Sequence, residues 1–177
     1  MSSTIKPKKL ALLIKSDFEM FDVVGFRSFI HVFLHNGWRC TIQIRIQQFF
    51  YSWRKLYIPY ILSVLVNRRM LKVYGVDICL GCEFGFGLKI PHPVSIVIGS
   101  RVKVGDRFTI LHGVTIGEKN ASGSGDGQYP TIGNDVLVGA NSSILGNVHV
   151  GDGASIGAHS LILKDVPGLS IVTGLYK

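Results

Sequence analysis

The chain has 177 residues, of which 47% are hydrophobic and 17% are charged, so it holds enough apolar side chain for a folded core and is not intrinsically disordered. No apolar run reaches the roughly 18 residues of a membrane span, and the apolar run near the basic N-terminus is too short for a secretory leader. The expected location is therefore the cytoplasm, and the net charge of +8 points to acidic partners or surfaces.

The charge divides the chain near Gly75. Residues 1–75 hold twelve Lys and Arg against three Asp and Glu, a net of +9, whereas residues 76–177 hold seven against eight, a net of −1. We expect two parts, a helical N-terminal segment over 1–75 and a second domain of different construction over 76–177.

Helix signals run through the first part. Ser16, followed three residues later by Glu19, has the pattern of a capping box and predicts a helix start. Gly37, in "HNG", predicts that this helix ends there. Further helical stretches are expected over 41–57 and from Pro59 to near Gly75.

The basic, aromatic-rich surface of this segment has two interpretations. One is a cap over an end of the second domain, with its Lys and Arg side chains in water, the usual fate of such residues. The other is a peripheral contact with the anionic inner face of a membrane. No nucleic-acid partner is expected, because no recognition motif accompanies the charge.

From residue 98 the chain repeats every six residues. The first position of each unit is aliphatic: Ile98, Val104, Ile110, Ile116, then Ile132, Val138, Ile144, Val150, Ile156 and Ile162. Six is not a helical period, and β-branched residues with frequent glycine favour short strands and tight corners. The pattern predicts a β-solenoid in which three units close one triangular coil, so that residues one coil apart lie above one another.

Two irregularities in this repeat mark a candidate site. A loop insertion at about 118–131, containing "NASGSGDGQYP", adds ten residues after Ile116, and such an insertion more often serves a site than stability. Two extra residues also enter within "PHPVSIV". Once these two are subtracted, Ile90 and Ile110 lie one coil apart, and His92 and His112 each follow one of them by two positions. We expect them to stack on adjacent coils, next to the face over which the insertion folds.

The other candidate metal ligands are interpreted as structural residues. Cys79 and Cys82 form a single C-x-x-C with no second pair to complete a zinc site, so two buried thiols and no metal are expected. His31 and His35 lie one helical turn apart but have no carboxylate or Cys in register, so they are interpreted as ordinary helix residues.

The unit [aliphatic]-Gly-x-x-[small]-x, together with "YGVDI", "ILHGVTIG" and "ILGNVHVGDGASIGAHSLILKDVP", resembles the hexapeptide-repeat acyltransferases over about residues 72–174. The resemblance is to their serine acetyltransferase-like and polysaccharide O-acetyltransferase branch. It implies a mainly β fold, a left-handed parallel β-helix with an N-terminal α-helical segment. It also implies a homotrimer that binds acetyl-CoA in a groove between subunits and transfers the acetyl group directly, without a covalent enzyme intermediate.

The same resemblance implies site residues. His92 occupies the position of the general base that deprotonates the acceptor hydroxyl, and Asp77, fifteen residues earlier, that of the carboxylate that orients it. His112 is expected near the thiol of acetyl-CoA or near the acceptor. The residues expected at acetyl-CoA are Gly117, Ala140 and Ala158 through their backbones and Lys164 near the phosphates.

The acceptor is inferred from two departures from the serine acetyltransferase pattern. Pro91 stands where an Asp usually precedes the base, and Gln128 and Tyr129 stand in place of an Arg-His pair. Loss of charged partners should remove discrimination for zwitterionic serine, whereas an amide and an aromatic ring suit a sugar. The expected function is therefore O-acetylation of a sugar hydroxyl in surface polysaccharide biosynthesis, in a capsule, exopolysaccharide or lipopolysaccharide. Serine O-acetylation is the alternative, and a non-catalytic scaffold is a third interpretation.

Overall fold

The computed structural model describes residues 4–21, 25–119 and 129–177, and the side chains of all of these except 25–29. The helices are α1 (Pro7–Glu19), α2 (Gly25–Leu34), α3 (Asn36–Ser52) and α4 (Tyr57–Tyr74). The strands are β1 (Asp77–Ile78), β2 (Glu83–Phe84), β3 (Val97–Ile98), β4 (Lys103–Val104), β5 (Thr109–Ile110), β6 (Thr115–Gly117), β7 (Thr131–Ile132), β8 (Leu137–Val138), β9 (Ser143–Leu145), β10 (His149–Val150), β11 (Ser155–Ile156), β12 (Leu161–Ile162), β13 (Ile171–Val172) and β14 (Leu175–Tyr176).

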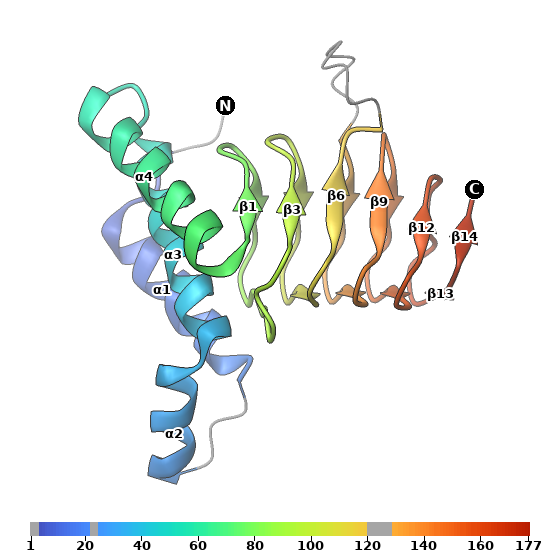
Figure 1. Ribbon diagram of the computed structural model, residues 1–177, viewed down its shortest axis with the longest axis horizontal. Coiled ribbons are helices and arrows are strands. Elements are labelled where there is room, and N and C mark those ends of the chain that lie inside the picture. Colours follow the sequence, from blue (N-terminus) through green and yellow to red (C-terminus); the bar gives the residue numbers. More distant parts are fainter. Residues whose placement is uncertain (1–3, 22–24, 120–128) are drawn as a thin grey trace.

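The strands form three parallel sheets around one core. The first sheet has the order β1-β3-β6-β9-β12-β14, the second β10-β7-β4-β2 and the third β13-β11-β8-β5. The chain visits the three sheets in turn, so each circuit is one coil of a three-sided parallel β-helix. The helices lie together at one end of this stack and the C-terminus at the other (Figure 1).

Strand pairing confirms the period of the repeat. Ile98 pairs with Ile116 and Ile144 pairs with Ile162, each eighteen residues further along the chain. Ile116 pairs with Ile144, twenty-eight residues on, because the insertion adds ten. Ile78 pairs with Ile98, twenty residues on, because two extra residues enter the first coil. Neither irregularity breaks the stack, since both are placed at corners.

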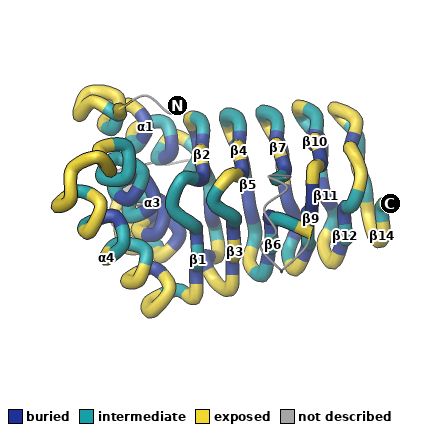
Figure 2. Tube along the Cα trace, turned by 90° about the horizontal axis from the view of Figure 1, so that it is seen from above, coloured by how far each residue is buried: buried dark blue, intermediate teal, exposed yellow. Residues whose placement is uncertain are grey.

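The inward aliphatic residues form one continuous core. Ile98, Ile110, Ile116, Ile144 and Ile156 have no exposed surface. In most strands the residue before the buried one is exposed or half-buried, as period-two strand geometry requires. Figure 2 shows these buried residues as bands that run across successive coils. The hexad therefore positions each strand through its apolar contact with the coils on either side.

Two helix boundaries differ from those that the sequence predicts. Ser16 lies inside α1, where its hydroxyl donates to the carbonyl oxygen of Leu13 at 2.8 Å, so it does not begin a helix. Gly37 does not end a helix but lies in the first turn of α3, which His35 caps. Both predictions were wrong because contacts with the β-helix, invisible in a local pattern, determine these positions. α4 does end as expected, with Gly75 in the left-handed conformation at φ 65°.

Helix side chains satisfy the backbone groups that the first coil exposes at the open end of the β-helix. From α3, the amide of Gln47 donates to the carbonyl of Ile78 at 2.9 Å and that of Gln48 to the carbonyl of Cys82 at 3.3 Å. From α1, the hydroxyl of Ser16 accepts from the N–H of Gly87 at 3.1 Å. An unprotected sheet edge is a template for aggregation, so this cover removes a liability of the fold.

A fully buried ion pair completes the cover. The guanidinium of Arg45 (α3) makes a bidentate contact with the carboxylate of Asp17 (α1), with N···O distances of 2.7 and 2.8 Å, and both side chains have no exposed surface. Arg45 also donates to the carbonyls of Phe84 and Gly85, and Asp17 accepts from the N–H of Leu88. The pair thus joins two helices and the first coil.

The energetics of this pair make it sensitive to the loss of one partner. Burial raises the pKa of the Asp17 carboxyl, against the opposing effects of Arg45 and the backbone N–H groups. Desolvation of the two charges therefore offsets much of the attraction between Arg45 and Asp17. The pair serves more to position α1 and α3 on the first coil than to add net stability. Removal of one partner leaves the other charge buried and unpaired.

We expect Arg45→Met to lower the free energy of unfolding by about 3–5 kcal/mol, because it leaves the buried Asp17 carboxylate and two backbone carbonyl groups without their hydrogen-bond donor. Denaturant unfolding followed by circular dichroism measures this loss. Arg107→Met is the matched control, since its pair with Asp135 is about half exposed, and its unfolding midpoint should stay close to wild type. Equal midpoints for the two variants would contradict the assigned role of Arg45.

Candidate functional site

His92 and His112 lie beside each other on one edge of the β-helix. Their ring centroids are 6.2 Å apart and their planes are inclined at 74°. Both side chains are exposed and follow the third sheet by two residues, at the corner where the chain turns toward the first sheet. Ala140 and Ala158 occupy the same position on the next two coils, because Ile110, Val138 and Ile156 pair in register. We call this column, His92, His112, Ala140 and Ala158, the histidine edge.

Backbone bonds hold the column together and leave some donors free. The carbonyl of His112 accepts from Asn141 at 2.9 Å, and the carbonyl of Ala140 accepts from His159 at 2.8 Å. In the part of the chain that the structure describes, the N–H groups of Ala140 and Ala158 have no protein acceptor. The edge therefore offers two imidazoles followed by two free backbone donors.

The corner that carries His92 faces the helical segment across a cavity of about 390 Å³. The corner contributes residues 91–94, and the helical segment contributes His31, Leu34, His35 and Asn36. The sequence interpretation of His31 and His35 as ordinary helix residues missed this arrangement. Their spacing of one helical turn was the only local signal, and it does not reveal which surface the helix end meets.

Asp77 has a different partner from the expected one. Its Oδ1 accepts from Nδ2 of Asn67 (α4) at 3.2 Å, and Asn67 in turn accepts from Gln47. Within the described residues no hydrogen bond joins Asp77 to His92. The half-buried carboxylate lies on β1, one coil before β3, and its Oδ2 has no hydrogen bond in the same residues.

The remaining predicted residues lie on another edge, which follows the first sheet. Gly117 ends β6, and Lys164 follows β12 with its Nζ 4.6 Å from the centroid of the Tyr176 ring. Tyr129 donates from its hydroxyl to Glu118 at 3.3 Å. We call this column, Gly99, Gly117, Glu118, Tyr129 and Lys164, the loop edge. The first sheet separates it from the histidine edge.

Tyr129 packs within the loop edge rather than toward His92. A Cβ at Gly99 would lie 2.9 Å from its ring, so the ring covers that corner, and the guanidinium of Arg101 lies 5.9 Å from the ring centroid. Gln128 and most of the insertion at 118–131 lie outside the described residues. Within one chain, therefore, Tyr129 offers no stacking face beside the histidines.

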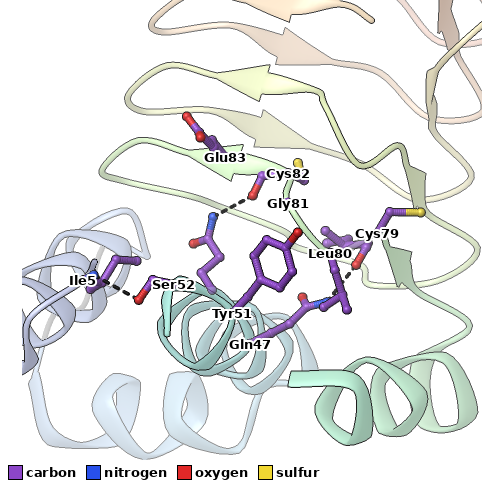
Figure 3. A pocket seen from close by; sticks show the side chains of 11 residues that line it. Ile5, Gln47, Tyr51, Ser52, Cys79, Leu80, Gly81, Cys82 and Glu83 are labelled. Atoms are coloured by element: carbon purple, nitrogen blue, oxygen red, sulfur yellow. Dashed lines mark hydrogen bonds between the residues drawn. The ribbon is translucent and has the colours of Figure 1, made fainter. Parts of the chain in front are cut away.

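The cysteines form no converging site. Figure 3 shows the sulfur atoms of Cys79 and Cys82 pointing in different directions at the turn that faces Gln47 and Tyr51 of α3. These residues line a cavity of about 60 Å³. All three cysteines are free, and burial raises the pKa of Cys82 well above its usual value and that of Cys40 to about 12. Within the described residues no group of three His, Cys, Asp or Glu side chains could hold a metal ion.

Comparison with known proteins relates this chain and its fold to a family of transferases. A family model described as bacterial transferase hexapeptide (six repeats) matches residues 129–164. "Serine acetyltransferase 4" of Arabidopsis thaliana is 42% identical over 114 residues, which cover 64% of this chain and 32% of that protein. A serine acetyltransferase of Helicobacter pylori is 42% identical over 103 residues, 58% of each chain. The chain thus spans about a third of the first relative's length and about three fifths of the second's.

Solved structures show the same similarity over more of the chain. A serine acetyltransferase from Brucella abortus strain S19 in complex with coenzyme A aligns with a TM-score of 0.82 and 28% identity, covering 95% of this chain and 66% of that one. A Neisseria gonorrhoeae serine acetyltransferase in complex with serine aligns with a TM-score of 0.77 and 30% identity, covering 94% and 67%. The alignments include the helical segment as well as the coils.

These findings correct the expected acceptor. The prediction of a sugar hydroxyl in surface polysaccharide biosynthesis was wrong, because the relatives and structures named above are serine acetyltransferases. Within one chain, Tyr129, which that prediction took as a stacking face for a sugar, lies on the loop edge with Glu118 and Gly99.

The repeat, the paired strands and these similarities agree, and the fold is the left-handed parallel β-helix preceded by helices that the sequence predicts. The chain therefore belongs to the hexapeptide-repeat acyltransferase superfamily and, within it, is serine acetyltransferase-like.

Proposed function

We propose that the protein is an acetyl-CoA-dependent O-acetyltransferase whose acceptor is the hydroxyl of L-serine. The observation that carries the proposal is the histidine edge, where exposed His92 stands between a cavity and a column with free backbone donors. The two substrates are inferred from the similar proteins whose structures are complexes with coenzyme A and with serine.

His92 is the proposed general base. A neutral imidazole takes the proton of the serine hydroxyl as the oxygen attacks the carbonyl carbon of the thioester. The carbon–sulfur bond then breaks, the leaving thiolate takes the proton from the imidazolium, and the acetyl ester of serine remains. Backbone N–H groups stabilise the oxyanion that forms between these steps. No group of the enzyme is acetylated in this scheme.

Asp77 remains the proposed carboxylate that stabilises the imidazolium of His92. Asn67 holds one of its oxygens and leaves Oδ2 without a hydrogen bond within the described residues. Through Asn67 the carboxylate is also coupled to Gln47, which covers the first coil. We therefore propose that Asp77→Asn lowers kcat while leaving the fold intact.

The column beyond His112 is the proposed path of acetyl-CoA. Three coil spacings separate His92 from Ala158, a length of about 14 Å at the usual strand spacing of about 4.8 Å. The free N–H groups of Ala140 and Ala158 face ligand amides along this length. Lys164 and Gly117 lie on the loop edge, on the other side of the first sheet. For these two residues to contact the same acetyl-CoA, the loop edge of another copy must form the opposite wall of the groove.

The separation of the predicted site residues onto two edges supports a homotrimer. The predicted site residues fall on two edges of one sheet, so a single chain presents two half-sites that point apart. A second copy that docks its loop edge against the histidine edge of the first brings both halves together. Three copies close such a head-to-tail contact into a ring, as symmetric assemblies require.

We expect His92→Ala to reduce kcat/KM for acetyl-CoA and L-serine by about 10²–10⁴-fold, the usual contribution of a general base. Thiol release from acetyl-CoA measures the rate, and sedimentation shows whether the oligomer is retained. His149→Ala, which removes an exposed histidine on the second sheet, is the control and should keep wild-type activity. Full activity in His92→Ala would reject the assignment, and no thiol release from wild type with L-serine would reject the function.

We also propose that the protein touches an anionic membrane face through α4. Among the described residues, no helix is long and apolar enough to cross a membrane. However, large apolar side chains are exposed around the start of this helix, with Tyr57 85% and Ile58 73% exposed, and five of them are considered together. We call them the α4 patch: Leu56, Tyr57, Ile58, Ile61 and Leu65.

The charge around the α4 patch favours lipid over a second copy. Exposed basic residues flank it on both sides: Arg54, Lys55, Arg68, Arg69 and Lys72. Residues 23–76 contain no Asp or Glu, so two α4 patches packed together would oppose like charges without a carboxylate to pair. An anionic bilayer accepts both the apolar side chains and the positive rim.

We expect wild-type protein to co-sediment with phosphatidylglycerol-containing vesicles and not with pure phosphatidylcholine. Ile58→Ser with Ile61→Ser should weaken binding at least about tenfold, since each removes apolar area from the contact. Leu169→Ser with Ile171→Ser, at the far end of the β-helix, is the matched control. Unchanged binding, or a change of oligomer size with no vesicle binding, would show that lipid is not the occupant.

A further inference from the structure

The cavity beside His92 is built by close backbone contact between two distant parts of the chain. A Cβ on Gly37 would lie 2.1 Å from the carbonyl oxygen of Ile90 and 3.1 Å from that of Pro91. The first turn of α3 therefore sits directly on the backbone that leads to His92, and only glycine permits this approach. The wall that α2 and α3 supply is thus fixed relative to the proposed base.

His35 lines this cavity, and one of its ring nitrogens is already committed to a helix cap. It is the N-cap of α3, and its Nδ1 accepts a hydrogen bond from the N–H of Gly37 at 3.1 Å. Burial lowers the pKa of His35, and the neighbouring imidazoles of His31 and His92 lower it further. A neutral ring whose Nδ1 is an acceptor carries its proton on Nε2. His35 is therefore a fixed N–H donor near neutral pH.

The other residues that line the cavity are also N–H donors or apolar. His31, whose ring centroid is 5.9 Å from that of His35, and Asn36 also bear N–H groups, and Leu34 with residues 91–94 supplies the apolar remainder. Among the described residues no carboxylate lines the cavity. The ring of Phe21, whose centroid is 6.2 Å from that of His35, carries a cation on its face, the ammonium group of Lys89.

A metal ion does not explain this cluster. Nδ1 of His35 is already used for the helix cap, and its ring must stay neutral to keep that bond. The described residues contain no set of three metal-ligating side chains at suitable distances. A wall of donors, to which the described residues add no carboxylate, instead matches a ligand that carries negative charge.

We infer that this cavity is the acceptor pocket and that Nε2 of His35, assisted by Asn36, holds the carboxylate of the acceptor while its hydroxyl faces His92. The inference rests on the proposed acetyl transfer to serine and adds how the acceptor is recognised. His35 is a specificity residue: it binds the acceptor in the ground state and takes no part in proton transfer. The helical segment is thereby part of the active site.

The variant that separates recognition from folding is His35→Asn. Asparagine is a favoured N-cap, so α3 keeps its start, but its shorter side chain does not reach the acceptor. We expect the KM for L-serine to rise about tenfold to a hundredfold, the effect of losing a hydrogen bond to a charged group. The kcat and the KM for acetyl-CoA should stay within about threefold of wild type. His149→Asn, at an exposed position on the second sheet away from both edges, is the matched control.

The acceptor series tests the carboxylate directly. With wild type, L-serinamide, which lacks the carboxylate charge, should show kcat/KM at least about tenfold below that of L-serine. With His35→Asn the two acceptors should become similar, because the residue that distinguishes them is gone. An unchanged KM for L-serine in His35→Asn, or a lower kcat with unchanged KM, would overturn the inference. Thiol release from wild type with L-serine would leave the proposed function standing in either case.

Discussion

The structure depends on how the open end of the β-helix is closed. A parallel coil exposes carbonyl and N–H groups at its first rung, because β1 and β2 are at the ends of their sheets and have no strand before them. Helix side chains do so instead, and the Arg45–Asp17 pair is the centre of that contact because it bonds at once to α1, α3 and the first coil. All five N–H groups of the guanidinium have acceptors, counting Gln48. A buried charge is tolerated here because its hydrogen bonding is complete.

That cover also positions the candidate site. Once Arg45 and Gln47 are bonded to the first coil, the start of the same helix must lie at the corner that precedes the second coil. There Gly37 contacts the backbone of Ile90, and His35 comes to face His92 across the cavity. One rigid helix thus connects the stability of the coil end to the geometry of the proposed acceptor pocket. The helical segment is better described as one wall of the site than as a cap alone.

The fold was predictable because the hexad is a local rule repeated many times. Ile98, Ile116 and Ile144 each begin a hexad, and this position alone predicts an inward-facing side chain. The strand register then follows from the number of residues between hexads. The stacking of His92 on His112 followed from the same count. The setting of His35 was not predictable, since the residues that define it, Ile90 and Pro91, lie more than fifty positions away. Ser16 misled for the same reason, because its partner Gly87 belongs to the coil.

Acceptor recognition illustrates where a sequence pattern fails. Compared with the serine acetyltransferase pattern, Pro91 stands in place of an Asp and Gln128-Tyr129 in place of an Arg-His pair, and the loss of these charged partners suggested a neutral acceptor. That argument assumed that recognition must stay at the same positions. The structure provides donors from another element, since His35 and Asn36 reach the corner that carries His92. A carboxylate held from the helical side needs no Arg-His pair on the insertion, and Tyr129 is then free to pack on the loop edge against Gly99. The departures in sequence and the similarity to serine acetyltransferases are therefore compatible.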